Sequence, residues 1–219
     1  NYITFNTANT MSYADNGKSI RYSATNACGT TTTTSVTIVV NDKPGVSAFV
    51  APAAVCSGND LTLTEPSVSD NGTAVTSKGW EIETAVGSGS YTTFTAPYTV
   101  NYTDNGKKLH FRATNACGTS YSTTQVISVD QSVTADAGAD QTVSCLCGGT
   151  SGNATMAAAV PNIGTGSWSW VTPSGTGTIT SPASATTTVT NLAAGSYTLR
   201  WTVTNGMCSA YDDVTITVT

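Results

Sequence analysis

Three observations predict an all-β protein, made of tandem β-sandwich modules that follow one another in a rod. Thr, Ser, Val, Gly and Asn dominate the 219 residues, and charged residues make up 10%, a composition that favours strands over helices. Two long stretches of the sequence repeat each other, as expected of a modular chain. Apolar and polar residues alternate along several segments, which is typical of strands with one buried face.

The repeat pairs residues 2–40 with residues 91–129 without gaps, and about half of the aligned positions are identical. Each aligned residue lies 89 positions after its counterpart, as Tyr91 follows Tyr2. The sequence Ala-Thr-Asn-Ala-Cys-Gly occurs in both copies, at 24–29 and at 113–118. Agreement of this length predicts that the two stretches fold alike.

The repeat also predicts where the modules begin and end. Residues 42–130 are expected to form one complete module, and residues 1–41 the C-terminal half of another, whose first half would precede residue 1. Residues 131–219 have nearly the same length but a different sequence, and they predict a related sandwich. The short junctions between these segments favour a semi-rigid rod over loosely tethered domains.

The alternation of apolar and polar residues predicts where the strands lie. In the last module, Tyr197, Leu199, Trp201 and Val203 are separated by polar residues, which predicts one buried face and one wet face. In the repeated stretches, Ile20 and Tyr22 should share a buried face, as should Leu109 and Phe111. Tight turns are expected at the three Asp-Asn-Gly sequences, which begin at Asp15, Asp70 and Asp104.

Charge and motifs exclude several classes of function. A net charge of -5 and a pI near 4.5, without a cluster of Lys and Arg, argue against nucleic acid as a partner. The sequence contains neither a long apolar span nor a signal-peptide pattern. No nucleophile elbow, zinc-binding helix or phosphate loop is present, and His110 is expected on an outward strand face without catalytic partners. We therefore expect no enzyme, no catalytic residues and no cofactor.

Six cysteines without zinc-site spacing predict disulfides and an oxidising, extracellular setting. The order Cys56, Trp80, Cys117 is typical of an immunoglobulin-like core, so we expect Cys56 to pair with Cys117. Cys208 should pair with Cys145 or Cys147, which leaves one cysteine over. By the repeat, the partner of Cys28 would precede residue 1.

Two sets of residues have a functional and a structural interpretation. Trp168 and Trp170 share one face of a strand and could stack on sugar rings, but large residues of this kind more often fill a core. Four aspartates near the start and end of the last module could bind calcium, although their spacing matches no known loop and solvated turns are the simpler interpretation; they are Asp136, Asp140, Asp212 and Asp213.

The last module resembles the PKD-like repeats of Bacteroidetes surface proteins, and the two ATNACG segments resemble the immunoglobulin-like repeats of the same giant proteins, including the SprB-type gliding-motility adhesins. The resemblance rests on five segments, Ala137–Val143, Gly164–Trp168, Thr186–Leu192, Gly195–Gly206 and Asp212–Ile216. Where the family has a single cysteine before the first long strand, this sequence has Cys145 and Cys147.

The resemblance implies a long adhesin on the cell surface, exported by the type IX secretion system, moved by the gliding machinery and anchored at the outer membrane. This chain would be a structural and adhesive stalk segment that contacts neighbouring repeats and extracellular surfaces or polysaccharide. The alternative is an array of carbohydrate-binding modules in a secreted polysaccharide-acting protein, which would need exposed aromatic residues near Trp168 and Trp170 or near Tyr91 and Tyr98.

Overall fold

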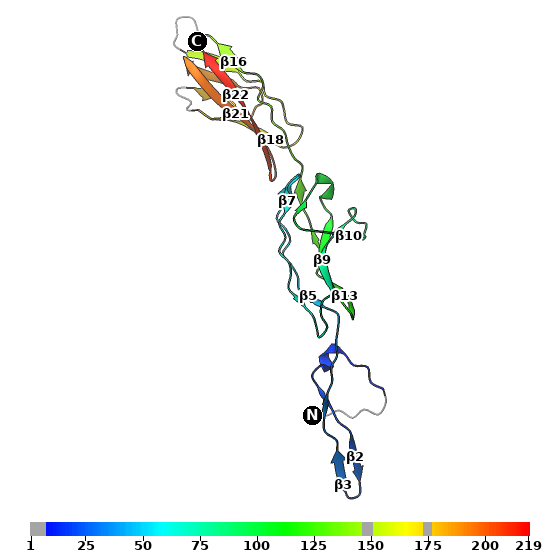
Figure 1. Cartoon of the computed structure of the whole chain (residues 1–219). Coiled ribbons are helices and arrows are strands. Elements are labelled where there is room, and N and C mark those ends of the chain that lie inside the picture. Colours follow the sequence, from blue (N-terminus) through cyan, green and yellow to red (C-terminus); the bar gives the residue numbers. More distant parts are fainter. Residues whose placement is uncertain (1–7, 146–150, 173–176) are drawn as a thin grey trace. The chain divides into compact units, whose positions relative to one another are not determined.

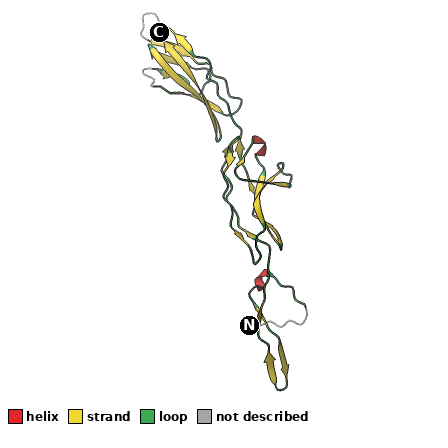
Figure 2. Ribbon diagram, in the orientation of Figure 1, coloured by secondary structure: helices red, strands yellow, loops and turns green. Residues whose placement is uncertain are grey.

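The computed structural model describes residues 8–145, 151–172 and 177–219. Strands form nearly all of the regular structure in these ranges, and the helical elements there are two short 3-10 turns, η1 (Tyr13–Asp15) and η2 (Tyr102–Asp104) (Figure 2). The predicted all-β fold is therefore confirmed. The β-branched Thr and Val residues that dominate the chain pack well on a pleated surface, which explains the preference for strands.

The chain divides into two compact units that are not simple halves of the sequence. One unit comprises residues 1–51, 63–96 and 107–126, and the other comprises residues 52–62, 97–106 and 127–219. Segments of the middle module thus belong to both units. We call them the N-terminal and the C-terminal unit.

The largest sheet of the N-terminal unit is antiparallel and belongs to the middle module. Its strands are β9 (Ser77–Glu83), β10 (Tyr91–Phe94), β12 (Lys108–Asn115), β13 (Gly118–Tyr121) and β14 (Gln125–Val126), in the order β10-β9-β12-β13 with β14 also paired to β12. A second pair joins β5 (Gly45–Val46) to β8 (Val68–Ser69). The remaining pairs join β1 (Ser19–Ile20) to β4 (Val36–Thr37) and β2 (Ser23–Asn26) to β3 (Gly29–Thr32).

The two copies of the repeat fold alike, as the sequence predicts. The turn η1 recurs as η2, the pairing of β1 with β4 recurs as that of β12 with β14, and the hairpin β2–β3 recurs as β12–β13. The copies differ in burial, because Ile20 and Tyr22 are 40% and 71% exposed whereas Leu109 and Phe111 are 0% and 1% exposed. The expectation of a buried face was wrong for the first copy, because no described residue covers it.

An aromatic cluster forms the centre of the middle module's core. Trp80 on β9 makes edge contacts with Phe49 and with Phe111 on β12, at ring-centroid distances of 4.8 and 5.0 Å. All three side chains are buried. Edge-to-face geometry adds to the hydrophobic contribution of such rings.

The C-terminal unit contains the last module as two sheets. One has the order β16-β22-β21-β18, with β16 (Gln141–Val143), β18 (Thr165–Trp170), β21 (Gly195–Asn205) and β22 (Cys208–Val218). The other joins β17 (Ser151–Thr155), β20 (Thr188–Ala193) and β19 (Thr178–Ile179). The long antiparallel strands β21 and β22 lie side by side (Figure 1).

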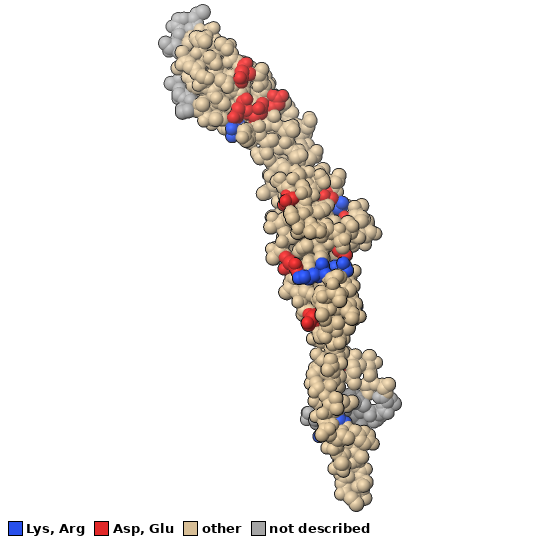
Figure 3. Space-filling model, viewed as in Figure 1, with Lys and Arg blue, Asp and Glu red and all other residues tan. Residues whose placement is uncertain are grey.

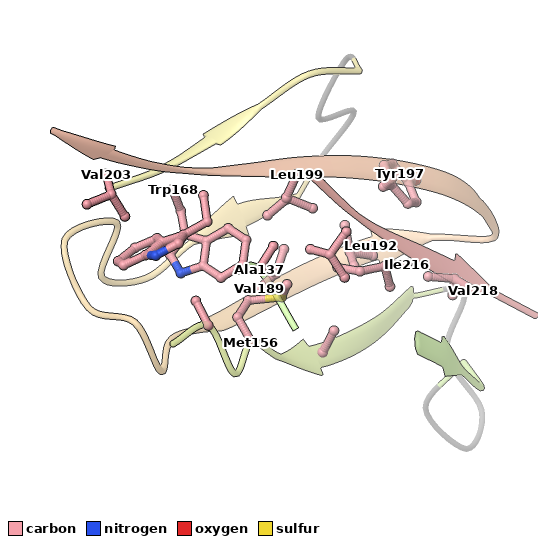
Figure 4. Packing of buried hydrophobic residues seen from close by; sticks show 14 residues of the cluster. Ala137, Met156, Trp168, Val189, Leu192, Tyr197, Leu199, Val203, Ile216 and Val218 are labelled. Carbon is pink, nitrogen blue, oxygen red and sulfur yellow. The ribbon is translucent and has the colours of Figure 1, made fainter. Parts of the chain in front are cut away.

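Apolar side chains of both sheets form the core of the last module (Figure 4). Leu199, Trp201 and Val203 are each at most 1% exposed, and the residues between them are half-buried or exposed, so the predicted alternation is confirmed. Trp201 covers Gly166, where a side chain would overlap the indole ring. Each fully buried aliphatic side chain of this core contributes about 1.5–3 kcal/mol.

Two further strand pairs complete the C-terminal unit. The strand β6 (Val55–Cys56) runs parallel to β15 (Val129–Asp130), with Cys56 opposite Asp130. The strand β7 (Asp60–Leu61) is antiparallel to β11 (Tyr98–Thr99). The pairing of β6 with β15 brings residues near the start of the middle module beside the residues that lead into the last one.

Candidate functional site

A disulfide joins Cys56 on β6 to Cys208 at the start of β22. The two Cα atoms are 4.9 Å apart, although 152 positions separate the residues in sequence. Cys208 is 2% exposed. The disulfide therefore links the beginning of the middle module covalently to the β21–β22 hairpin of the last module.

Asp130 organises the chain around this disulfide. Its side-chain Oδ2 accepts a hydrogen bond of 2.7 Å from the Met207 backbone N–H. Its carbonyl oxygen lies 3.4 Å from Cys208 Sγ, a contact and not a hydrogen bond, because a disulfide sulfur carries no proton. Asn205 Nδ2 donates to the Gln131 carbonyl oxygen at 2.9 Å. The whole turn of the hairpin is thus bound to residues 130–131.

Gly206 makes this close approach possible. Its φ is +56°, and a Cβ at this position would overlap the carboxylate of Asp130. A residue with a side chain would have to adopt a disfavoured backbone conformation and displace the carboxylate as well. Cys56, Asp130, Gly206, Met207 and Cys208 together form the feature that we call the disulfide junction.

The structure corrects the predicted disulfide pairings. Pairing of Cys56 with Cys117 was wrong, and so was pairing of Cys208 with Cys145 or Cys147, because Cys56 and Cys208 bond to each other. The reason is long-range pairing: Cys56 lies beside Asp130 at the end of the middle module, whereas Asn115, two residues before Cys117, donates to the carbonyl oxygen of Asp42 at its beginning.

The other cysteines have no disulfide among the described residues. Cys28 and Cys117 are exposed thiols, and Cys145 is a half-buried thiol that packs against the core of the last module. Cys147 lies outside the described residues.

The two tryptophans proposed to bind a glycan belong to the core. Trp168 is 3% exposed, and its indole N–H donates to the carbonyl oxygens of Ser184 and Ala185 at 3.1 and 3.3 Å; its ring lies among the core side chains in Figure 4. Trp170 is half-buried, packs against the same core and meets Tyr197 edge-on at 6.1 Å. Both rings lie on the inward face of the strand, as the favoured core interpretation expects, and the sugar-stacking alternative loses this pair.

The four aspartates proposed for calcium bind other partners. Asp212 Oδ2 accepts from the Ala137 N–H, Asp136 Oδ1 from the Gly138 N–H, and Asp140 Oδ1 from the Thr215 N–H. Asp213 is bidentate with Arg200 at 2.8 and 2.9 Å, and this guanidinium lowers the pKa of the Asp213 carboxyl. In the ranges that the structure describes, no three potential ligands gather as a metal site, so these residues do not form the proposed cluster.

His110 is buried on the outward face of β12, and the expectation of an exposed residue was wrong. It is 7% exposed, stacks on Tyr91 at 4.1 Å and contacts Tyr121 at 4.7 Å. Its Nε2 lies 2.9 Å from Glu81 Oε2, and Arg112 Nε lies 2.8 Å from the other carboxylate oxygen. The carboxylate and the two rings hold the imidazole in a fixed position on this face of the sheet.

Sequence analysis missed the disulfide junction, although two signals pointed to it. The Asn-x-x-Cys sequence of the last module marks a tight hairpin, and Asp130 stands at a module boundary. Neither signal says which strand lies beside the hairpin, because that depends on long-range pairing.

Comparison with known proteins supports the assignment of the last module. Residues 137–218 match the family model for the K319L-like PKD domain. The last module is therefore similar to a PKD domain. This match lies within residues 131–219, the segment expected to form the third module, and no curated protein matches the sequence.

Solved structures of multi-domain proteins show remote similarity. The I-band fragment I67-I69 from titin is 14% identical, covers 93% of this chain and 75% of its own, and has a TM-score of 0.41. Extracellular domains 3-5 of Drosophila OTK are 15% identical, with coverages of 87% and 67% and a TM-score of 0.42. The PKD domain of human KIAA0319 is 20% identical, with coverages of 40% and 80% and a TM-score of 0.32.

The strand pairing and the family match together describe a chain of β-sandwich modules, the last of which is similar to a PKD domain. A disulfide and a PKD-like module together indicate an extracellular domain. Within the described residues, no helix has the length and apolar character needed to cross a membrane.

Proposed function

We propose that the chain is a structural and adhesive stalk segment of a large secreted cell-surface adhesin, acting in surface attachment and gliding motility. The observation that carries the proposal is the disulfide junction, because it joins two successive modules covalently where a stalk would otherwise depend on a short linker. Export by the type IX system, anchoring at the outer membrane and contact with the gliding machinery are parts of the same proposal.

The character of the surface supports this function. Charged side chains are few, and most of the face seen in Figure 3 is neither acidic nor basic. Strand positions that face outward carry mainly Thr and Ser, as at Thr198, Thr202 and Thr204. Such a surface suits a spacer that must remain inert along its length.

Stretching a single molecule from its two ends tests the mechanical part of the proposal. In the oxidised chain, the segment between Cys56 and Cys208, which are 152 positions apart, is shielded from force by the disulfide. Reduction should add about 500 Å of extension, at roughly 3.4 Å per residue. The Cys208→Ser variant should show the longer extension without reductant. Equal extensions of the oxidised and reduced chains would show that the disulfide does not carry the applied force.

The adhesive part is tested on cells of the source organism. Deleting the modules described here from the parent gene should reduce attachment and gliding while growth is unchanged, and intact cells should bind antibodies raised against the chain. Normal attachment of the deletion strain, or antibody binding only after lysis, would contradict the proposal.

The alternative of carbohydrate binding now depends on the positions near Tyr91 and Tyr98, of which Tyr91 lies beside His110 and the exposed Tyr121, because Trp168 is buried in the core and Trp170 is half-buried against it. Trp80, Trp168 and Trp201 are buried and should resist acrylamide quenching whether or not polysaccharide is added, so the two functions are separated by comparing glycan binding to the unaltered chain and to Tyr121→Ala. The Trp168→Ala variant should lose about 3–5 kcal/mol of stability. A glycan that binds the unaltered chain and fails to bind Tyr121→Ala would favour the alternative.

A further inference from the structure

We propose that Cys117 is the site of a second inter-module disulfide, formed with a cysteine at the Cys56-equivalent position of a module of the same type on its amino-terminal side. Each module would then be linked to the preceding one through the late hairpin that carries its cysteine, as Cys208 is linked to Cys56. Cys28 stands at the same place in the first copy of the repeat and would form the next link.

The hairpins that carry Cys117 and Cys208 are built alike. In both, an asparagine ends the first strand and a two-residue turn follows, with Asn115 opposite Gly118 and Asn205 opposite Cys208. Both asparagines bind the backbone that leads into their own module: Asn115 Nδ2 donates to the Asp42 carbonyl oxygen at 2.8 Å, and Asn205 Nδ2 donates to the Gln131 carbonyl oxygen at 2.9 Å. Each hairpin is therefore bound to the backbone at the beginning of its own module.

The position of the thiol differs by one residue between the two hairpins. Cys117 occupies the second position of the turn, whereas Cys208 is the first residue after it. The Cys117 N–H donates to Asn115 Oδ1 at 2.9 Å, and the Cys28 N–H donates to Asn26 Oδ1 at 2.8 Å. The turn geometry is thus a shared property of the repeat, and it leaves the thiol exposed in both copies.

The first copy of the repeat also contains the segment with which the strand that carries the partner cysteine would pair. Cys56 is brought to its disulfide by the pairing of β6 with β15, and the residues aligned with β15 are Val40 and Asn41. Val40 N–H donates to Asn16 Oδ1 at 3.0 Å, just as Val129 N–H donates to Asn105 Oδ1 at 3.0 Å. The backbone at Val40 is therefore held by the same asparagine hydrogen bond that holds β15.

The exposed apolar face of the first copy indicates which kind of chain segment would pair with Val40 and Asn41. Ile20 and Tyr22 are exposed, whereas the aligned Leu109 and Phe111 are buried in the complete module. A segment like residues 42–89 would cover this face, pair with Val40 and Asn41, and bring a cysteine to the entrance of the middle module. The partner of Cys117 is thus the first half of a module like 42–130.

The disulfide requires an oxidant. With a small-molecule disulfide such as oxidised glutathione, one thiolate attacks the reagent and releases one reduced glutathione. The second thiolate attacks the mixed disulfide and releases another, so two thiols lose two protons and two electrons while one glutathione disulfide is reduced.

The test is a chain in which the middle module is duplicated, with residues 1–130 followed directly by residues 42–219. In a glutathione redox buffer, Cys56 of the first copy should bond to Cys117 of the second copy, and Cys56 of the second copy to Cys208. Peptide mapping without reduction identifies both pairs. Cys117 of the second copy should become resistant to iodoacetamide, whereas Cys117 of the unaltered chain is alkylated.

Copy-specific variants provide matched controls. Cys56→Ser in the first copy should restore alkylation of Cys117 in the second copy and leave the Cys208 disulfide intact, whereas Cys56→Ser in the second copy should free Cys208 alone. The Cys208 disulfide reports correct folding of the duplicated chain. A second chain, with residues 42–89 placed before Asn1, should form the same bond to Cys117. Alkylation of the second-copy Cys117 in the folded duplicated chain and of Cys117 in the second folded chain would overturn the proposal. A bond between Cys117 and Cys56 of its own module would also overturn it.

Discussion

At the residue scale, the disulfide junction depends on Gly206 as much as on the two cysteines. The Met207 N–H reaches Asp130 Oδ2 at 2.7 Å because the preceding residue has no side chain and a φ of +56°. The same carboxylate would occupy the position of a Cβ at Gly206. The absence of a side chain is therefore what allows the hairpin to lie against Asp130.

Gly206→Ala should destabilise the C-terminal unit by about 2–4 kcal/mol, because it adds a steric overlap to the cost of a positive φ. Gly195→Ala is the control: Gly195 also has a positive φ, of +149°, but the nearest atom to its Cβ position would be 3.9 Å away. Denaturant unfolding of both variants measures the difference. Equal losses would show that the overlap with Asp130 is relieved without cost.

At the scale of elements, Glu83 connects the β9–β10 hairpin to the start of β12. The carboxylate is 2% exposed and accepts hydrogen bonds from the Gly89 N–H at 3.0 Å and from the Lys108 N–H at 3.1 Å. The bond from Gly89 is the main reason why the pKa of Glu83 lies below its ordinary value of 4.5, the bond from Lys108 acts in the same direction, and burial opposes both. The ionised carboxylate therefore stabilises the folded sheet.

Because the pKa is lowered on folding, this stabilisation is present above pH 4.5 and is lost as the pH falls through the folded value. Unfolding measured by denaturant should show stability declining below pH 4.5, and Glu83→Gln should weaken this decline and reduce stability at neutral pH. Glu65→Gln, which removes the same charge from an exposed ion pair with Lys78, is the control. An unaltered pH profile in Glu83→Gln would assign the acid sensitivity to another group.

At the scale of the whole molecule, the disulfide closes a loop of about 150 residues that includes most of the middle and last modules. Cross-linking restricts the unfolded chain more than the folded one, and the loop-entropy model gives about 5 kcal/mol for a loop of this length. Two modules that would otherwise be linked only through residues 130–131 thus share a covalent constraint.

Cys208→Ser should lower the free energy of unfolding by about 2–5 kcal/mol under oxidising conditions. Cys117→Ser should have little effect in this chain, since Cys117 is an exposed thiol outside the disulfide. Thermal unfolding with and without reductant measures both variants. If reductant lowered the melting temperature of Cys208→Ser as much as that of the unaltered chain, the disulfide would not be the source of the stability.

The sequence by itself determined the kind of elements and their repetition. Alternation along Tyr197–Val203 predicts a strand with one buried face because side chains of a strand point to opposite sides. The repeat predicts that η1 and η2 form alike, because local turn chemistry depends on neighbouring residues. The similarity of the last module to a PKD domain was also predictable from its own motifs.

Only the tertiary structure decided which distant residues meet. Cys56 pairs with Cys208 because β6 lies against β15 and the β21–β22 hairpin binds Asp130, and neither contact is encoded in local spacing. His110 is buried because Tyr91 from β10 and Tyr121 from β13 cover it, although its own strand position faces outward. Local periodicity fixes the face on which a side chain lies, whereas its partner and its burial depend on strands that are remote in sequence.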